Sequence, residues 1–175
     1  GDVSFRMPES GLLQSVAAYK DDLGLDYKNY GIGDRQRRSV AAQPTQFPDD
    51  GNETLRLTGS KLLTVSVVDQ TGLPISGVTV SPWLLAKYDQ SDYLNLSGLQ
   101  LSQTTSSDGK VSFPWFPKWQ AETITIWANK SGYDHPRGFY SPKLDDGQTT
   151  IQLQKLLPIR GRVTNGVGEP IEGLT

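Results

Sequence analysis

The stretch that decides the fold reads Leu63-Thr64-Val65-Ser66-Val67-Val68-Asp69-Gln70-Thr71-Gly72. Apolar and polar side chains alternate over its first half, which is typical of a β-strand that shows one face to a core. Its second half has the composition of a turn, because an aspartate side chain accepts hydrogen bonds from nearby backbone and glycine adopts positive φ at little cost. The stretch therefore predicts a strand that ends in a tight turn.

The same alternation recurs through the rest of the chain. Further runs lie at 78–80, 111–113, 123–128 and 150–153, and turn signals separate them at Ser107-Asp108-Gly109 and Asp145-Asp146-Gly147. Each run predicts a half-buried antiparallel strand. Short strands separated by such turns indicate an all-β fold, an antiparallel β-sandwich.

The chain also repeats itself. A shift of 96 positions places 49–79 on 145–175 without a gap and with 11 of 31 residues identical, and a shift of 108 places Gly1 to Phe5 on Gly109 to Phe113 and Gly24 on Gly132. A fixed period with matching turn residues is the signature of a tandem array. We therefore predict the C-terminal half of one repeat at 1–57, a complete β-sandwich at 62–153, and the N-terminal strands of a following repeat at 158–175.

The motif from Val67 to Val80, followed by 105–113, resembles the carboxypeptidase regulatory-like domain. This resemblance implies a sandwich of transthyretin-like or Ig-like topology, found in tandem in bacterial extracellular and envelope proteins, and a non-catalytic role. Pro74 and Gly77 suit the motif, since proline presets φ after the turn and glycine permits the bend into the next strand.

One connection is longer than the resemblance implies. Residues 82–103 carry large apolar side chains, among them Trp83, Leu85 and Leu94. Loops of more than about 12–15 residues are usually functional, packed or disordered. We expect this segment to be ordered and folded against the sandwich.

Composition excludes several classes of partner. The net charge is −2 and the isoelectric point near 5.4, so a basic surface for nucleic acid is not expected. No run approaches the roughly 18 apolar residues of a membrane span, and no signal peptide is visible. Cysteine is absent, which removes disulfides and thiolate metal sites.

The inventory of reactive side chains argues against an enzyme. The only histidine is His135, so a zinc site with several histidines cannot form, and flanking proline and glycine favour a solvated or loop-packing role for it. Carboxylate pairs at 21–22, 49–50 and 145–146 are adjacent in sequence and favour turn caps over a calcium site. No metal, cofactor or catalytic residue is predicted.

Aromatic side chains are the better functional candidates. Ile124, Ile126 and Ala128 take the core-facing positions of their strand, which leaves Trp127 on the outer face. By the same pattern we expect Val16 and Ala18 to point inward and Tyr19 outward.

Two further tryptophans, Trp115 and Trp119, are expected to have different environments. Trp115 shares the parity of Phe113 and is expected to close the core, while Trp119 follows Pro117 in a loop. Tyr19, Trp119 and Trp127 are therefore the candidate ligand-binding residues, since an aromatic ring held at a surface stacks on sugars or anchors proteins. The alternative for Tyr19 and Trp127 is that they lie under long loops or at the joint between units.

One basic cluster stands out on this acidic chain. Arg35-Gln36-Arg37-Arg38 could grip a carboxylate or phosphate, although such clusters are more often simply solvated.

These features predict a structural, spacer or interaction module of a larger bacterial envelope or secreted protein, located outside the cell. Its partners would be neighbouring repeats of the same or an adjacent chain, and a polysaccharide or protein. A carbohydrate-binding module using the exposed aromatics is one alternative. The other is a head-to-tail fibre in which the incomplete units at the two ends of the chain pair by strand complementation; a simple cut between units explains the same ends.

Overall fold

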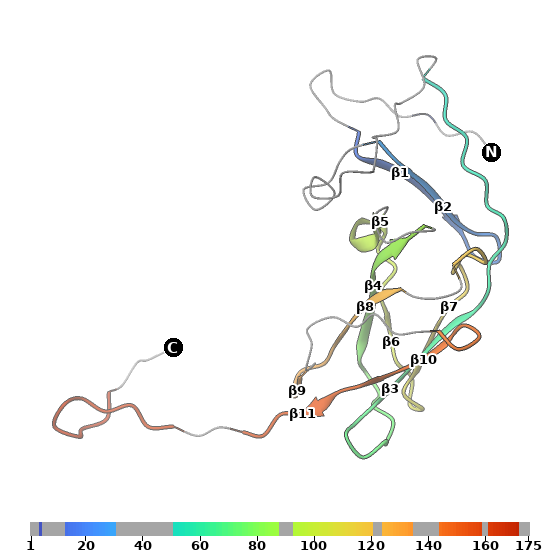
Figure 1. Cartoon of the computed structure of the whole chain (residues 1–175). Coiled ribbons are helices and arrows are strands. Elements are labelled where there is room, and N and C mark those ends of the chain that lie inside the picture. The colour runs from blue at the N-terminus through green and yellow to red at the C-terminus, as the bar shows by residue number, and fades with distance from the viewer. Residues whose placement is uncertain are drawn as a thin grey trace.

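The computed structural model describes residues 4, 13–30, 51–87, 93–120, 124–134, 144–158 and 161–171, which are nearly all strand, turn or extended chain (Figure 1). In chain order the elements are β1 (Ser15–Lys20), β2 (Gly24–Asn29), β3 (Leu63–Val68), β4 (Thr79–Ala86), β5 (Tyr93–Asn95), η2 (Leu96–Leu99), β6 (Gln103–Thr104), β7 (Lys110–Phe113), β8 (Thr125–Asn129), β9 (Tyr133–Asp134), β10 (Gln148–Gln152) and β11 (Gln154–Lys155).

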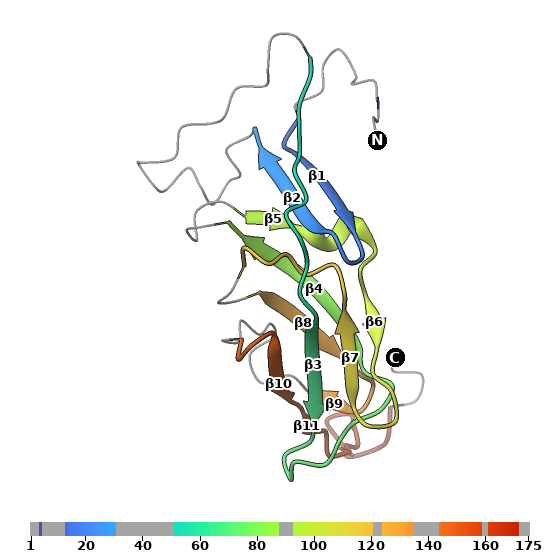
Figure 2. The same ribbon diagram turned by 90° about the vertical axis from the view of Figure 1, so that its right-hand side faces the viewer.

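Two sheets form the sandwich. One has the strand order β10-β3-β7, and the other joins β5, β4 and β6, with β8 also paired to β4. β1 and β2 form an antiparallel hairpin beside β5 at one end of the molecule, and β9 pairs with β11 at the other (Figure 2). The prediction of an all-β sandwich is confirmed.

One strand direction was predicted wrongly. β10 runs parallel to β3, with Ile151 opposite Val67, although every run was expected to be antiparallel. Alternation of side chains reports which residues face the core and carries no information on the direction of the neighbouring strand.

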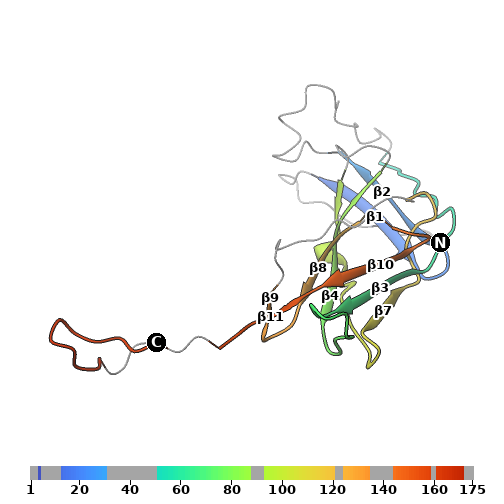
Figure 3. The ribbon, with the colours of Figure 1, turned by 60° about the horizontal axis from the view of Figure 1, so that its bottom comes forward.

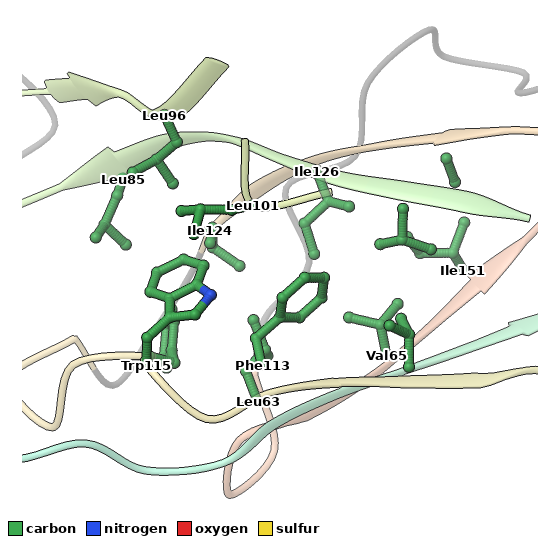
Figure 4. Packing of buried hydrophobic residues seen from close by; sticks show 14 of the residues in the cluster. Leu63, Val65, Leu85, Leu96, Leu101, Phe113, Trp115, Ile124, Ile126 and Ile151 are labelled. Atoms are coloured by element: carbon green, nitrogen blue, oxygen red, sulfur yellow. The ribbon is translucent and has the colours of Figure 1, made fainter. Parts of the chain in front are cut away.

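Side chains from both sheets meet in one core. Phe113 and Trp115 project between the two sheets, with Leu63 labelled below Phe113, Val65 beside it and Ile126 above it (Figure 4). The expected inward positions of β3, β7, β8 and β10 are all buried, so the alternation predicted these faces correctly. At roughly 1.5–3 kcal/mol per fully buried large apolar side chain, this cluster dominates the stability of the sandwich.

The long connection after Pro82 extends the second sheet. β4 continues through Ala86, and β5 returns alongside it with Leu94 opposite Leu85. The chain then turns through η2, whose Asn95 side chain caps it by accepting a hydrogen bond from Ser97 N at 3.0 Å. Leu85, Leu94, Leu96 and Leu101 are buried, so the described part of this segment packs against the sandwich as expected.

The β1–β2 hairpin shares the core of the sandwich. Leu25 and Tyr27 are each 1% exposed and belong to the same buried cluster as β3 and β8. The expectation for β1 is wrong: Ala18 is exposed, and Ala17, opposite Tyr27, packs against the cluster. β2 turns Leu25 and Tyr27 toward the sandwich. The residues opposite them on β1, Tyr19 and Ala17, therefore face the sandwich as well.

The C-terminal segment 161–171 lies away from the sheets in both Figure 1 and Figure 3. It nevertheless repeats the turn after β3. Asp69 N donates to Leu73 O at 2.8 Å, and 96 positions later Asn165 N donates to Glu169 O at 2.9 Å. Gly72 and Gly168 have φ of 87° and 88°.

The side-chain cap of the turn recurs as well. Oδ1 of Asp69 accepts hydrogen bonds from the backbone N of Thr71 and Leu73, and Oδ1 of Asn165 accepts from the backbone N of Val167 and Glu169. The sequence repeat is therefore also a structural repeat at this turn.

Candidate functional site

A joint connects the β1–β2 hairpin to the sandwich, and Lys87 lies at its centre. Nζ of Lys87 is 2.6 Å from Oδ1 of Asp26 and donates to Tyr27 O at 3.2 Å. It also lies 5.3 Å from the ring centroid of Tyr27 and 5.8 Å from that of Trp119. A cation so placed is held both by charge and by the ring faces.

Trp119, one of the predicted ligand-binding residues, belongs to this joint. Its Nε1 donates to Leu25 O at 3.0 Å, and its ring packs on Tyr27 with centroids 6.1 Å apart. Tyr27 in turn donates from its hydroxyl to Leu85 O at 3.3 Å. These contacts give Trp119 a structural role in holding the hairpin on the sandwich.

Tyr19, the second predicted residue, also contacts the sandwich. Its ring stands edge-on to Trp115 with centroids 6.5 Å apart, and its hydroxyl is 3.5 Å from Leu99 O. The side chain remains 43% exposed. Tyr19 therefore lies at the contact between the hairpin and the sandwich, as the alternative interpretation of this residue expected.

An extended segment, residues 51–61, forms a strap between the hairpin and β3. Gly59 N donates to Leu23 O, Lys118 N donates to Gly59 O, and Lys61 N donates to Phe116 O, at 2.8–3.0 Å. At the near end Arg56 N donates to Oδ2 of Asp26 at 2.8 Å. The strap thus binds both partners of the joint through its backbone.

Glu53 fixes the start of the strap to β2. Its carboxylate accepts hydrogen bonds from Nζ of Lys28 and the hydroxyl of Tyr30, both at 2.5 Å. The bonds from Lys28 and then Tyr30 lower the pKa of Glu53 to about 2. Burial, with the same bond to the carboxylate, raises the pKa of Tyr30.

Trp127, the third predicted residue, lies on the outer face of the second sheet, as expected. It is 42% exposed, while its neighbours Ile126 and Ala128 are buried. Trp83, at the irregular pairing of β4 with β8, packs against it with ring centroids 5.5 Å apart. We call Trp83 and Trp127 the aromatic face.

The sequence did not single out Trp83 as a surface residue. It lies where the register of β4 with β8 shifts between Pro82 and Leu84, on the same face of β4 as Ser81. Its place opposite β8 depends on pairing between strands far apart in the chain.

The remaining candidates from the sequence add nothing to this site. His135 and the arginines at 35, 37 and 38 lie outside the described residues. Among the residues that the structure describes, no group of three His, Cys, Asp or Glu could hold a metal ion. No helix within the described ranges has the length and apolar character needed to cross a membrane.

Comparison with known proteins gives only distant similarity. The sequence matches no protein-family model and no curated protein. Among solved structures it is similar to the shaft pilin SpaA of Lactobacillus rhamnosus GG, with 15% identity and a TM-score of 0.38. A singly substituted variant of that pilin gives 14% identity and a TM-score of 0.41. In both comparisons the similarity covers 81% of this chain and 60% of the pilin.

Proposed function

We propose that this chain is a non-catalytic structural module of a tandem β-sandwich array, in which successive units are joined rigidly end to end. Its place would be in a larger bacterial envelope or secreted protein. The division into units at 1–57, 62–153 and 158–175 is part of this proposal.

The joint carries the proposal. Leu25 and Tyr27 are buried in the core of the sandwich, and the Lys87–Asp26 ion pair and the strap reinforce the contact. Units connected by a flexible linker would move independently. A shared core instead transmits orientation from one unit to the next, which is what a rod or spacer requires.

The recurring turn supports the same proposal. The bonding pattern around Asp69 returns around Asn165, so the chain opens a further unit with the device that opens the central one. Stacked repeats of this kind contact mainly their neighbours.

Native-state hydrogen exchange tests the rigid joint. If the hairpin and sandwich unfold together, the amides of Val16 and Lys28, which lie in the hydrogen-bonded positions of the β1–β2 ladder, will exchange as slowly as those of Val65 and Val67. Leu25→Ala should lower protection in both regions, whereas Leu23→Ala, at a residue 46% exposed, should change neither. A hairpin that exchanges much faster than β3 would refute the rigid module.

A second candidate is a head-to-tail fibre formed by strand complementation. Val163 and Ile171 are exposed, although Val67 and Ile75, at the matching positions 96 residues earlier, are buried. Another copy of the chain could cover them by strand addition. Light scattering over a concentration series tests this candidate: growth that disappears on deletion of 158–175 supports it, and a 19.2 kDa monomer at every concentration contradicts it.

A further inference from the structure

One dipeptide in the C-terminal segment differs chemically from its counterpart in the central unit. The later turn carries Asn165-Gly166, the only Asn-Gly pair in the chain, whereas the matching turn 96 positions earlier carries Asp69-Gln70. Asparagine is among the chemically labile side chains. A following glycine increases this lability, because it has no Cβ to hinder the approach of its backbone nitrogen to the asparagine side chain. The two turns therefore have the same hydrogen-bonding pattern and different reactivity.

Both reacting groups are accessible in the structure. Asn165 and Gly166 are exposed, and the backbone N of Gly166 makes no hydrogen bond to another described residue. A Cβ at Gly166 would meet no atom within 4 Å. Gln70, at the matching position beside the complete sandwich, is exposed as well, so access is a property of this turn.

The cap of the later turn is a neutral amide that faces a carboxylate. Oδ1 of Asn165 accepts hydrogen bonds from the backbone N of Val167 and Glu169, and Nδ2 donates to Oε2 of Glu169, each at 3.0 Å. The residue in the place of Glu169 in the first turn is the uncharged Leu73. A second carboxylate in the place of the Asn165 amide would therefore put two like charges in contact, which is unfavourable.

We propose that Asn165-Gly166 is a site of spontaneous deamidation, which converts this neutral cap into an anionic one. The backbone N of Gly166 gives its proton to hydroxide and attacks Cγ of Asn165. The bond from Cγ to Nδ2 breaks, and the side-chain nitrogen takes a proton from water and leaves as ammonia. Water then opens the cyclic imide at either carbonyl, which gives aspartate or isoaspartate at this position. The net reaction consumes one water and releases one ammonia without any transfer of electrons, and it does not depend on the proposed array.

The two products affect the turn differently. The aspartyl product keeps an acceptor oxygen, and Asp69 shows that a carboxylate caps this geometry, but it places its charge against Glu169. The isoaspartyl product inserts a methylene group into the main chain, so the bond from Asn165 N to Glu169 O loses its geometry. Both products loosen the turn, the isoaspartyl product more than the aspartyl one.

Mass spectrometry of the folded full chain measures the reaction. Trypsin cleaves after Arg162 and releases 163–175 as one peptide, because no lysine or arginine follows. The exchange of an NH2 group for OH is read from its mass, and isoaspartate from electron-transfer fragmentation. Product should accumulate with first-order kinetics and about tenfold faster per pH unit, since hydroxide removes the proton. Asn52, which is exposed and precedes Glu53, should not react over the same period; equal rates at Asn52 and Asn165 would overturn the proposal.

Gly166→Gln is the matched control, because Gln70 occupies this position in the first turn and the new Cβ meets no neighbouring atom. It should slow conversion at least about tenfold and leave the amide NMR signals of Val167 and Glu169 in place. The same chain unfolded in urea gives the reference rate. We expect the folded chain to react within about tenfold of this rate, and a slower reaction would show that the turn protects Asn165 and would overturn the proposal.

Asn165→Asp tests the effect of the new charge on the turn. Solvent exchange of the Gly168 amide, which donates to Asn165 O, should become about threefold faster, the size expected for an exposed charge pair. Adding Glu169→Gln to this variant should restore the original rate. Exchange that is unchanged by Asn165→Asp would overturn the conversion of the cap as an event that alters the turn.

Discussion

Nζ of Lys87 lies 2.6 Å from Oδ1 of Asp26, and this ion pair links the end of β4 to β2. The two side chains are only 20% and 13% exposed, and aromatic rings flank the cation. Little water reaches the pair, so each charge depends on the other far more than at a surface bridge.

Lys87→Met should therefore destabilise the protein by about 3 kcal/mol, because it leaves the Asp26 carboxylate buried without its cation. Asp26→Asn should reduce the free energy of unfolding by less, because the amide oxygen can still accept a hydrogen bond from the backbone N of Arg56. The double variant should cost clearly less than the sum, which chemical denaturation in a double-mutant cycle measures.

A matched control is Lys28→Met at the other described ion pair. Lys28 is 42% exposed, and its partner Glu53, although only 12% exposed, keeps the hydroxyl of Tyr30 and the backbone N of Thr54 as donors, so this change should cost less than Lys87→Met. Equal losses for the two lysine variants would contradict a special role for Lys87.

Two glycines at matching positions of the repeat should respond differently to alanine. Both Gly24 and Gly132 have positive φ, so each substitution costs about 1–2 kcal/mol in backbone strain. At Gly24 a Cβ would also lie 2.5 Å from Gly59 O in the strap, whereas at Gly132 nothing lies within 4 Å. Gly24→Ala should lower the calorimetric Tm clearly more than Gly132→Ala; similar shifts would mean that the strap is not held closely.

The strap should loosen in acid. Glu53 has its pKa lowered to about 2 in the folded protein, so its stabilising contribution is complete above the ordinary value of 4.5 and is lost as pH falls from 4.5 toward 2. The difference in unfolding free energy between the natural chain and Glu53→Gln should shrink over this window. Added salt should reduce the difference at pH 7, because Lys28 is partly solvated; a pH-independent difference would argue against the bond.

Two tryptophans should differ on replacement by phenylalanine. Nε1 of Trp115 is buried and has no hydrogen-bond partner among the described residues, whereas Nε1 of Trp119 donates to Leu25 O. Trp119→Phe should therefore cost about 1 kcal/mol more than the loss of ring size alone, while Trp115→Phe recovers the cost of an unsatisfied donor. Urea denaturation of both variants measures the two losses in stability. After allowance for the larger buried ring area removed at Trp115, a remaining loss at Trp115 that equals or exceeds the one at Trp119 would contradict the prediction.

The sequence predicted the sandwich because burial on a strand follows a period of two. Val65 and Val67 on β3, and Ile126 on β8, are buried as the alternation requires. The same pattern failed at Ala17 and Ala18, two small residues whose apolar character is equal. Which face of β1 contacts the sandwich is determined by Leu25 and Tyr27 on the neighbouring strand β2. The sequence of β1 alone does not contain this information.

The candidate surface could be predicted only in part. Trp127 follows from its buried neighbours, but its partner Trp83 lies where the register of β4 with β8 shifts, and the joint around Lys87 combines residues from positions 26, 87 and 119. Contacts between such distant positions depend on the packing of complete elements, which single-strand periodicity does not encode.

The turn around Asn165 has a consequence for how such a chain folds. Its bonds close a loop of only a few residues, and they form in a segment that lies away from the sheets. Closing so short a loop carries a small entropic cost, so the turn around Asn165 can form before contacts with distant parts of the chain are made. The matching turn around Asp69 closes a loop of the same length, so both turns can act as local nuclei while the chain is being synthesised.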